Sequence, residues 1–363
     1  MLAIRSVVLK LTILMLLLPG CKIQDEKLTR QEAMEFAGKM EKAITKGDPG
    51  FLDNAFSEKE FSKRVALENS DDAKSFIRGA LAKFKIGSQL TAMLTDKDDF
   101  SLVKYYENKG KPHLIFRVYL HSSKSLNYHD YELLKQNGEL KIADVYIYLS
   151  GEFLSETCKN LYTTLQSHAE GNNTSFANAD MPEVNALPEI KKLFMNGKYA
   201  EAKEKLDNLP VYLRKAKTIL LMNIQVCSGI DTDHFSKAIE EYVAAYPTAE
   251  NINFLMIDGY FIQKDYNKVL IAVNKLDSQI NKDPFLDYFR YLAYYSLKRN
   301  DDAKECIQRL TKAMPEFEDG FIEMFGICLQ EGEKKQADSV KAIYRTKRKF
   351  NQERLQNLEA LYR

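Results

Sequence analysis

The sequence predicts an α+β domain that is followed by an all-α helical-repeat region. Between about residues 89 and 149, apolar and polar residues alternate with the period of two that is typical of β-strands. The stretches before and after have the 3.6-residue period of helices. In addition, a short phrase that starts at Gly197 returns about every 34 residues towards the C-terminus.

Length and composition limit the class of protein. The chain has 363 residues, enough for two domains, and its 45% hydrophobic and 28% charged residues are an ordinary globular balance. This balance excludes a disordered chain and a protein with many membrane spans. The formal charge of +1 excludes the basic field with which nucleic-acid binders neutralise phosphates, so we expect no nucleic-acid partner.

The first 21 residues have the pattern of an export signal. Arg5 and Lys10 precede the apolar stretch 11–18, which is shorter than the roughly 20 residues of a membrane span but suits a secretory signal. The segment LLPGC, which ends at Cys21, resembles the lipobox of bacterial lipoproteins. The resemblance implies removal of residues 1–20, acylation of Cys21 with chains such as palmitate, and anchoring in a lipid bilayer. The alternative is an ordinary signal peptide that contains a cysteine.

The residues after Cys21 bear on location. By the same resemblance, Lys22 in place of an Asp favours the outer membrane of the bacterial cell envelope. Asp25 and Glu26 loosely resemble the acidic export signals of Bacteroidetes lipoproteins, which leaves periplasmic and surface-facing positions both open. We expect residues 21–27 to form a lipidated tether.

Residues 28–167 are expected to contain helices first and strands later. Thr29 and Glu32 form a capping-box pattern before the first helix, and helical stretches follow at 50–68 and 71–85. Strands are expected at 89–95, 100–106, 113–121, 126–135 and 139–149. This element order, together with the segment GDPGFLDNAF at 47–56, resembles the nuclear-transport-factor-like family. The resemblance implies a cone-like domain with a curved antiparallel sheet.

Alternation assigns the two faces of this sheet. Leu114, Phe116, Val118 and Leu120 share the side that is expected to be the core, and the opposite side is expected to be solvent-exposed. Tyrosines gather on that second side, namely Tyr119, Tyr128, Tyr146 and Tyr148. Three interpretations remain open for them: packing against the repeat region or a dimer mate, contact with an external partner, and plain exposure.

The repeat region is expected at 187–345, after a small and polar linker at 168–186. The recurring phrase places compact residues at intervals of 36, 31, 34 and 34, at Ala202, Ala238, Val269, Ala303 and Ala337. The phrase GKYAEA (197–202) and this spacing resemble the tetratricopeptide repeat. The resemblance implies five helical hairpins, a capping helix at 346–363, and bulky aromatics such as Tyr260, Tyr294 and Tyr295 at inner positions of a binding groove.

Candidate chemistry is sparse. None of the sequence motifs for nucleotide, metal or acyl-transfer sites is present, so we expect no cofactor and no metal. The most plausible polar set comprises Arg117, His121, His129 and Asp144, with Asp130 nearby, provided that their strands are neighbours. Such a pocket could hold a small molecule or support acid/base catalysis. The alternative is that these residues are solvated or satisfied at a domain interface.

The four remaining cysteines, Cys158, Cys227, Cys306 and Cys328, are expected to be buried apolar residues, although a Cys306–Cys328 disulfide is also open. The function that these features favour together is a membrane-anchored, non-enzymatic scaffold. Its helical-repeat groove would bind a protein or peptide whose identity the sequence does not reveal.

Overall fold

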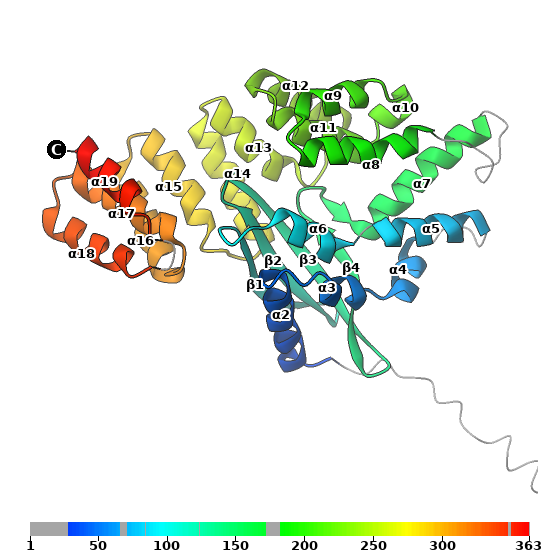
Figure 1. Ribbon diagram of the computed structural model, residues 1–363, viewed down its shortest axis with the longest axis horizontal. Helices are drawn as coiled ribbons and strands as arrows, with labels where there is room; N and C mark the ends of the chain where they lie inside the picture. Colours follow the sequence, from blue (N-terminus) through cyan, green and yellow to red (C-terminus); the bar gives the residue numbers. More distant parts are fainter. Residues whose placement is uncertain are drawn as a thin grey trace, which may run out of the picture.

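The computed structural model describes residues 28–65, 71–83, 85–122, 124–171, 182–347 and 350–362. Cys21, the expected signal peptide and tether, and the middle of the expected linker lie outside these residues. The fold has the two predicted parts: a five-stranded antiparallel sheet with accompanying helices, and an all-helical region after it (Figure 1). None of the described helices is long and apolar enough to cross a bilayer.

The described helices before the sheet are α2 (Arg30–Thr45), α3 (Gly50–Ala55), α4 (Glu58–Val65), α5 (Asp71–Lys83) and α6 (Ile86–Met93). The capping box at the start of α2 is confirmed. Thr29 Oγ1 accepts a hydrogen bond from the Glu32 amide at 3.2 Å, and the Glu32 carboxylate accepts one from the Thr29 amide at 2.9 Å.

The prediction of a strand at 89–95 is wrong, because α6 covers most of this stretch. Asp53 of α3 holds the start of α6: its carboxylate accepts hydrogen bonds from the Gly87 amide at 2.7 Å and the Ser88 hydroxyl at 2.5 Å. Gly87 lies so close to the Pro49 carbonyl that a Cβ would stand 2.3 Å from that oxygen. Because the cap comes from another helix, the local apolar pattern does not reveal it.

The sheet is a meander in which each strand pairs with the next. Its strands are β1 (Asp99–Asn108), β2 (Lys111–Leu120), β3 (Ser125–Gln136), β4 (Glu139–Ile147) and β5 (Glu152–Phe153). The other four predicted strands are confirmed, and the short β5 takes the fifth place. Two-residue turns with positive φ, Lys109-Gly110 and Asn137-Gly138, join β1 to β2 and β3 to β4.

The first face of the sheet carries the predicted apolar core. Leu114, Phe116 and Val118 are buried there with Met40 of α2 and Phe61 of α4. Helix α7 (Leu154–Gly171) closes the same core after the last strand. Apolar side chains therefore fill the space between this face and its helices.

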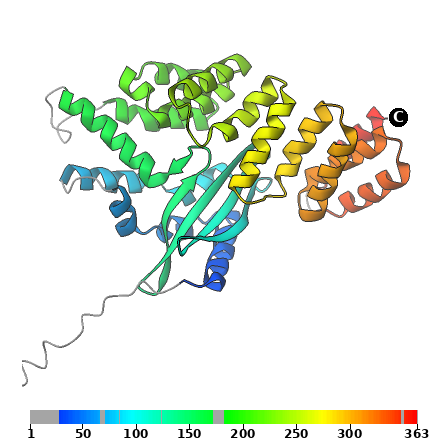
Figure 2. The ribbon, with the colours of Figure 1, turned by 180° about the vertical axis from the view of Figure 1, so that it is seen from behind.

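The helical region consists mainly of successive pairs of packed helices, which form an arc along one side of the sheet (Figures 1 and 2). The pairs are α8 (Pro182–Met195) with α9 (Tyr199–Asp207), α11 (Lys217–Ser228) with α12 (Thr232–Ala245), α13 (Ile252–Ile262) with α14 (Tyr266–Gln279), α15 (Leu286–Ser296) with α16 (Asn300–Ala313), and α17 (Glu318–Gln330) with α18 (Lys334–Arg345). The short α10 (Val211–Arg214) follows the first pair, and α19 (Gln352–Leu361) packs on α17.

The compact residues of the recurring phrase lie in the second helix of each pair. Ala202, Ala238, Val269, Ala303 and Ala337 are all buried. Small side chains at these positions let the paired helices approach each other closely.

Candidate functional site

The second face of the sheet is buried, so the expectation that it is solvent-exposed is wrong. Ile115, Tyr119 and Tyr128 belong to a hydrophobic core that they share with helices α13 to α19. Figures 1 and 2 show α13 and α14 lying against the sheet on this side. The interpretation of the tyrosines as packing against the protein's own helical region therefore holds for Tyr119 and Tyr128.

The helical region reaches the sheet through three positions that are 34 residues apart, each at the start of the first helix of a pair. The Asn251 side-chain amide donates to the Leu149 carbonyl at 2.7 Å. The Phe285 ring packs on the Tyr119 ring with centroids 4.6 Å apart. Asp319 pairs with His121 at 2.7 Å. Successive pairs thus place equivalent residues on the sheet.

Arg117 of β2 is the polar centre of this interface. Its guanidinium donates to both carboxylate oxygens of Asp283, at 2.7 and 2.8 Å, and to Asp99 at 2.8 Å. The Tyr128 hydroxyl donates to the same Asp283 carboxylate at 2.8 Å, and the Phe285 ring lies beneath the guanidinium. Burial opposes the charge of Arg117, but the charges of Asp283 and Asp99 outweigh it and raise the pKa of the guanidinium.

A second buried polar group lies on the same face of the sheet. The His113 ring is 3.0 Å from Asp130, which also accepts a hydrogen bond from the Tyr106 hydroxyl. The Tyr106 ring stacks on the His113 ring with centroids 4.8 Å apart. Burial and the charge of Asp130 raise the pKa of Tyr106, so this hydroxyl stays protonated as a donor.

The predicted convergence of Arg117, His121, His129 and Asp144 is wrong. Arg117 and His121 each pair with a separate acid of the helical region, as described above. His129 pairs in register with Phe116, on the opposite face of the sheet from Arg117, where burial lowers its pKa to about 4. Asp144 of β4 instead faces the start of α7, where its carboxylate accepts a hydrogen bond from the Ser155 hydroxyl at 2.5 Å. Each residue is satisfied in its own place.

Of the other tyrosines expected to form an interaction surface, Tyr146 and Tyr148 pack edge-on with ring centroids 5.1 Å apart, whereas Tyr260, Tyr294 and Tyr295 lie on α13 and α15. The Tyr146 hydroxyl donates to Glu250, and Tyr148 packs edge-on against Tyr128. Lys268 lies over the Tyr260 ring and Arg299 over the Tyr294 ring, next to the turns between paired helices. Tyr295 is 39% exposed, with its hydroxyl donating to Gln330 at 3.1 Å.

All four cysteines of the described chain are free thiols and buried, as expected for apolar residues. Burial raises the pKa of Cys158 to about 12 and that of Cys306 to about 11. Neither thiol is therefore activated as a nucleophile at neutral pH.

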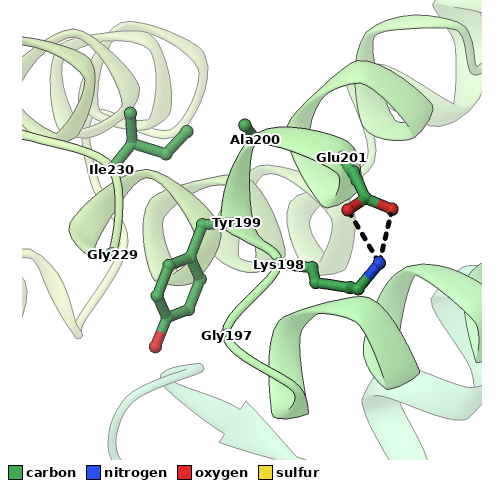
Figure 3. Close-up of a pocket in the computed structure, with 7 residues that line it drawn as sticks. All are labelled: Gly197, Lys198, Tyr199, Ala200, Glu201, Gly229 and Ile230. Carbon is green, nitrogen blue, oxygen red and sulfur yellow. Dashed lines mark hydrogen bonds and ion pairs between the residues drawn. The ribbon is translucent and has the colours of Figure 1, made fainter.

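Two surface hollows stand out among the residues that the structure describes. One, of about 250 Å³, lies where the turn between α8 and α9 meets the end of α11 (Figure 3). The Tyr199 ring packs over Gly229 there, where a Cβ would stand 2.5 Å from the ring. Lys198 and Glu201 form an ion pair at its edge. This hollow surrounds a packing contact between neighbouring helices.

The other hollow is an open groove of about 280 Å³ between α12 and α13. Its walls are mainly apolar, with Ile239, Val243 and Ala244 on α12 and Met256 and Gly259 on α13. The groove lies on the hydrophobic core that α11, α12 and α13 share, to which Ile239, Val243 and Met256 belong. It is a place where a partner could bury apolar surface.

Within the described residues, no group of three or more His, Cys, Asp or Glu side chains is arranged to hold a metal ion. No protein-family model matches the chain, and a comparison with curated proteins gives no match either.

Proposed function

We propose that the protein is a bacterial outer-membrane lipoprotein that serves, without catalysis, as a scaffold for a protein or peptide partner. Its helical region is a tetratricopeptide-like stack, and its sheet domain is cone-like and of the nuclear-transport-factor-like type. The apolar groove between α12 and α13 is the observation that carries the proposal, and a segment of the partner binds there.

The chemistry of the groove favours an apolar anchor of a peptide. Polar atoms come from Ser236, Glu240 and Gln263, which can hydrogen-bond a peptide backbone beside the apolar floor. Gly259 keeps the floor open, since it has no side chain between Met256 and Ile239. At about 280 Å³ the groove is smaller than the roughly 300–1,000 Å³ of most small-molecule pockets, which also tend to enclose their ligand.

The alternative function, small-molecule binding or acid/base catalysis in the sheet domain, has no observation in its favour. Arg117, His121, His129 and Asp144 are engaged in separate contacts, and the buried His129 is neutral at pH 7 because its pKa is about 4. A general acid or base works best with a pKa near the working pH.

Two neighbouring alanines test the groove. Both are exposed on α12, but Ala244 lines the groove and Ala245 does not. Ala244→Glu places a carboxylate against the docked apolar segment, whereas Ala245→Glu adds the same charge outside it. The partner that copurifies with the wild-type protein from the native envelope should be retained by Ala245→Glu and reduced about tenfold or more by Ala244→Glu.

Equal recovery of the partner with both variants would contradict the groove as the binding site. Thermal unfolding followed by circular dichroism should give the same midpoint for both variants, so that a folding defect is distinguished from a binding defect.

Lipid anchoring has its own test. Cys21→Ala removes the sulfur that would carry the acyl chains, so the protein should leave the membrane fraction and incorporate no labelled palmitate. Retention in the membrane fraction would refute the anchoring part of the proposal.

A further inference from the structure

The described chain starts at one particular end of the sheet. Leu28 is buried, and Thr29 caps α2, so the path of the chain is fixed from this point. In the first turn of α2, Glu32 pairs with Lys135 of β3 at 3.1 Å, and Arg30 lies over the Tyr105 ring of β1. These partners are close to the ends of β1 and β3.

The order of strands shows which end this is. In a meander, the β1–β2 and β3–β4 turns lie at the same end of the sheet, and the β2–β3 and β4–β5 turns lie at the other. Lys135 and Tyr105 stand beside the first pair of turns, which we call the hairpin tips: residues 108–111 and 136–139. The helical region covers the second face of the sheet and reaches the opposite end through Asn251 and Asp319 (Figures 1 and 2).

The tether is short compared with the sheet. Six residues separate Cys21 from Leu28, so Cys21 lies at most about 25 Å from the start of the fold. The ten residues of β2 alone extend about 33 Å from the hairpin tips towards the other end of the sheet. An anchor at Cys21 therefore holds the hairpin tips near the bilayer, while the docking edge of the helical region is a sheet's length further away.

We propose that the hairpin tips face and contact the phospholipid bilayer, and that the helical region projects away from it. This inference rests on the proposed lipid anchoring at Cys21. The hairpin tips are thus a second interaction surface of the protein, and their partner is the headgroup layer of the membrane.

The chemistry of the tips suits headgroups and not the acyl interior. Lys109, Gly110, Asn137 and Gly138 are exposed and polar. The neighbouring charges are of both signs, for example Lys111 and Glu139. The tips therefore lack the apolar face of a segment that inserts into the acyl region. They also carry no large excess of one charge, so their contact with headgroups does not require anionic lipid.

The test attaches the chain that begins at Cys21 to vesicles of phosphatidylcholine through a maleimide-bearing lipid. The four other cysteines are buried, so the Cys21 thiol is the one that reacts. Exposed lysines are then acetylated with a water-soluble ester, and mass spectrometry measures their rates in the tethered and free protein. Lys109 and Lys124 are a matched pair, since both are exposed turn residues with positive φ, at opposite ends of one sheet.

Tethering should slow the acetylation of Lys109 about threefold or more and leave Lys124 and the helical-region residue Lys264 unchanged. Equal slowing of Lys109 and Lys124, or no slowing of Lys109, would overturn the orientation, and so would selective slowing of Lys264. Because the lipid is attached chemically, the outcome does not depend on acylation in cells. Failure of the proposed anchoring would instead appear as absence of palmitate from Cys21.

Discussion

Replacement of Asp283 by Ala tests how the sheet and the helical region are joined. The Asp283 carboxylate is buried in the turn before α15. It accepts hydrogen bonds from the Arg117 guanidinium, the Tyr128 hydroxyl and the Phe285 amide, at 2.7 to 3.0 Å. Its removal leaves a buried cation with Asp99 as its remaining acid and leaves the Tyr128 hydroxyl without its acceptor.

The expected cost follows from these losses. Breaking a buried ion pair from one side costs about 3–5 kcal/mol, because the other charge is left uncompensated. The stranded hydroxyl adds about 1–3 kcal/mol, and Asp99, which is about one-third exposed, offsets part of the total. We expect Asp283→Ala to lower the free energy of unfolding by about 4 kcal/mol. The double variant Arg117→Met/Asp283→Leu removes both charges and should cost much less, about 1–2 kcal/mol.

Urea unfolding measures the loss, and hydrogen exchange locates it. Amides of β2, β3 and the turn between α14 and α15 should exchange faster in Asp283→Ala, because the interface opens there first. Asp338→Ala, which alters an exposed aspartate of α18, is the control and should change stability by less than about 0.5 kcal/mol. A loss below about 1 kcal/mol for Asp283→Ala, or a double variant that is as unstable as the single one, would refute the reasoning.

Two further predictions concern Glu132 and Gly151. Burial raises the pKa of Glu132, but hydrogen bonds and charges from two basic partners outweigh it and lower the pKa from 4.5 to about 2. The stabilisation by the ionised Glu132 is therefore complete above about pH 4.5, and it is lost as the pH falls towards 2. Glu132→Gln should cost about 3 kcal/mol at pH 7 and almost nothing near pH 2 in urea unfolding; an equal cost at both pH values would contradict this. Gly151 has a φ of +65°, and a Cβ there would stand 2.8 Å from Asn251. Gly151→Ala should lower the thermal midpoint more than Gly110→Ala, which has a similar φ but open space around it, and an equal effect would rule out the contact as the cause.

Local features of the fold could be predicted because their causes are local. The turn Asn137-Gly138 needs two residues that tolerate positive φ, and the sequence supplies them between two alternating segments. The capping box of Thr29 and Glu32 spans three residues. By contrast, α6 was predicted as a strand because its cap, Asp53, lies on another helix.

The burial of the second sheet face could not be predicted from alternation. Alternation separates polar from apolar residues, but it does not say whether the polar ones meet water. Arg117 is buried because Asp283, which is 166 positions away in the sequence, neutralises it. A usable signal is present in the sequence: polar or aromatic residues at the starts of the first helices of three pairs, Asn251, Phe285 and Asp319, recur every 34 residues. Such a spacing indicates a row of equivalent side chains along one edge of the stack.

The predicted pocket of Arg117, His121, His129 and Asp144 is wrong because its residues do not share one face of the sheet. His129 and Arg117 were expected to share a face, but the β2–β3 register pairs His129 with Phe116 of the core face. Successive residues of a strand point to opposite faces, so alternation within β3 already separates His129 from Tyr128, which is expected on the second face and pairs with Arg117. The groove between α12 and α13 was not predicted either, since it arises where two helical pairs meet and carries no motif.

The docking of the sheet bears on where a partner can bind. The starts of α13, α15 and α17 are occupied by the sheet, and α19 lies on α17, where Arg354 pairs with Asp319. The groove between α12 and α13 is outside these contacts, and one of its walls, α13, begins at Asn251 on the end of the sheet that is opposite to the start of α2. With Cys21 in the bilayer, the groove would stand about a sheet's length, roughly 30 Å, from the headgroups. A partner could then reach it without displacing the membrane contact, so the hairpin tips and the groove can act at the same time.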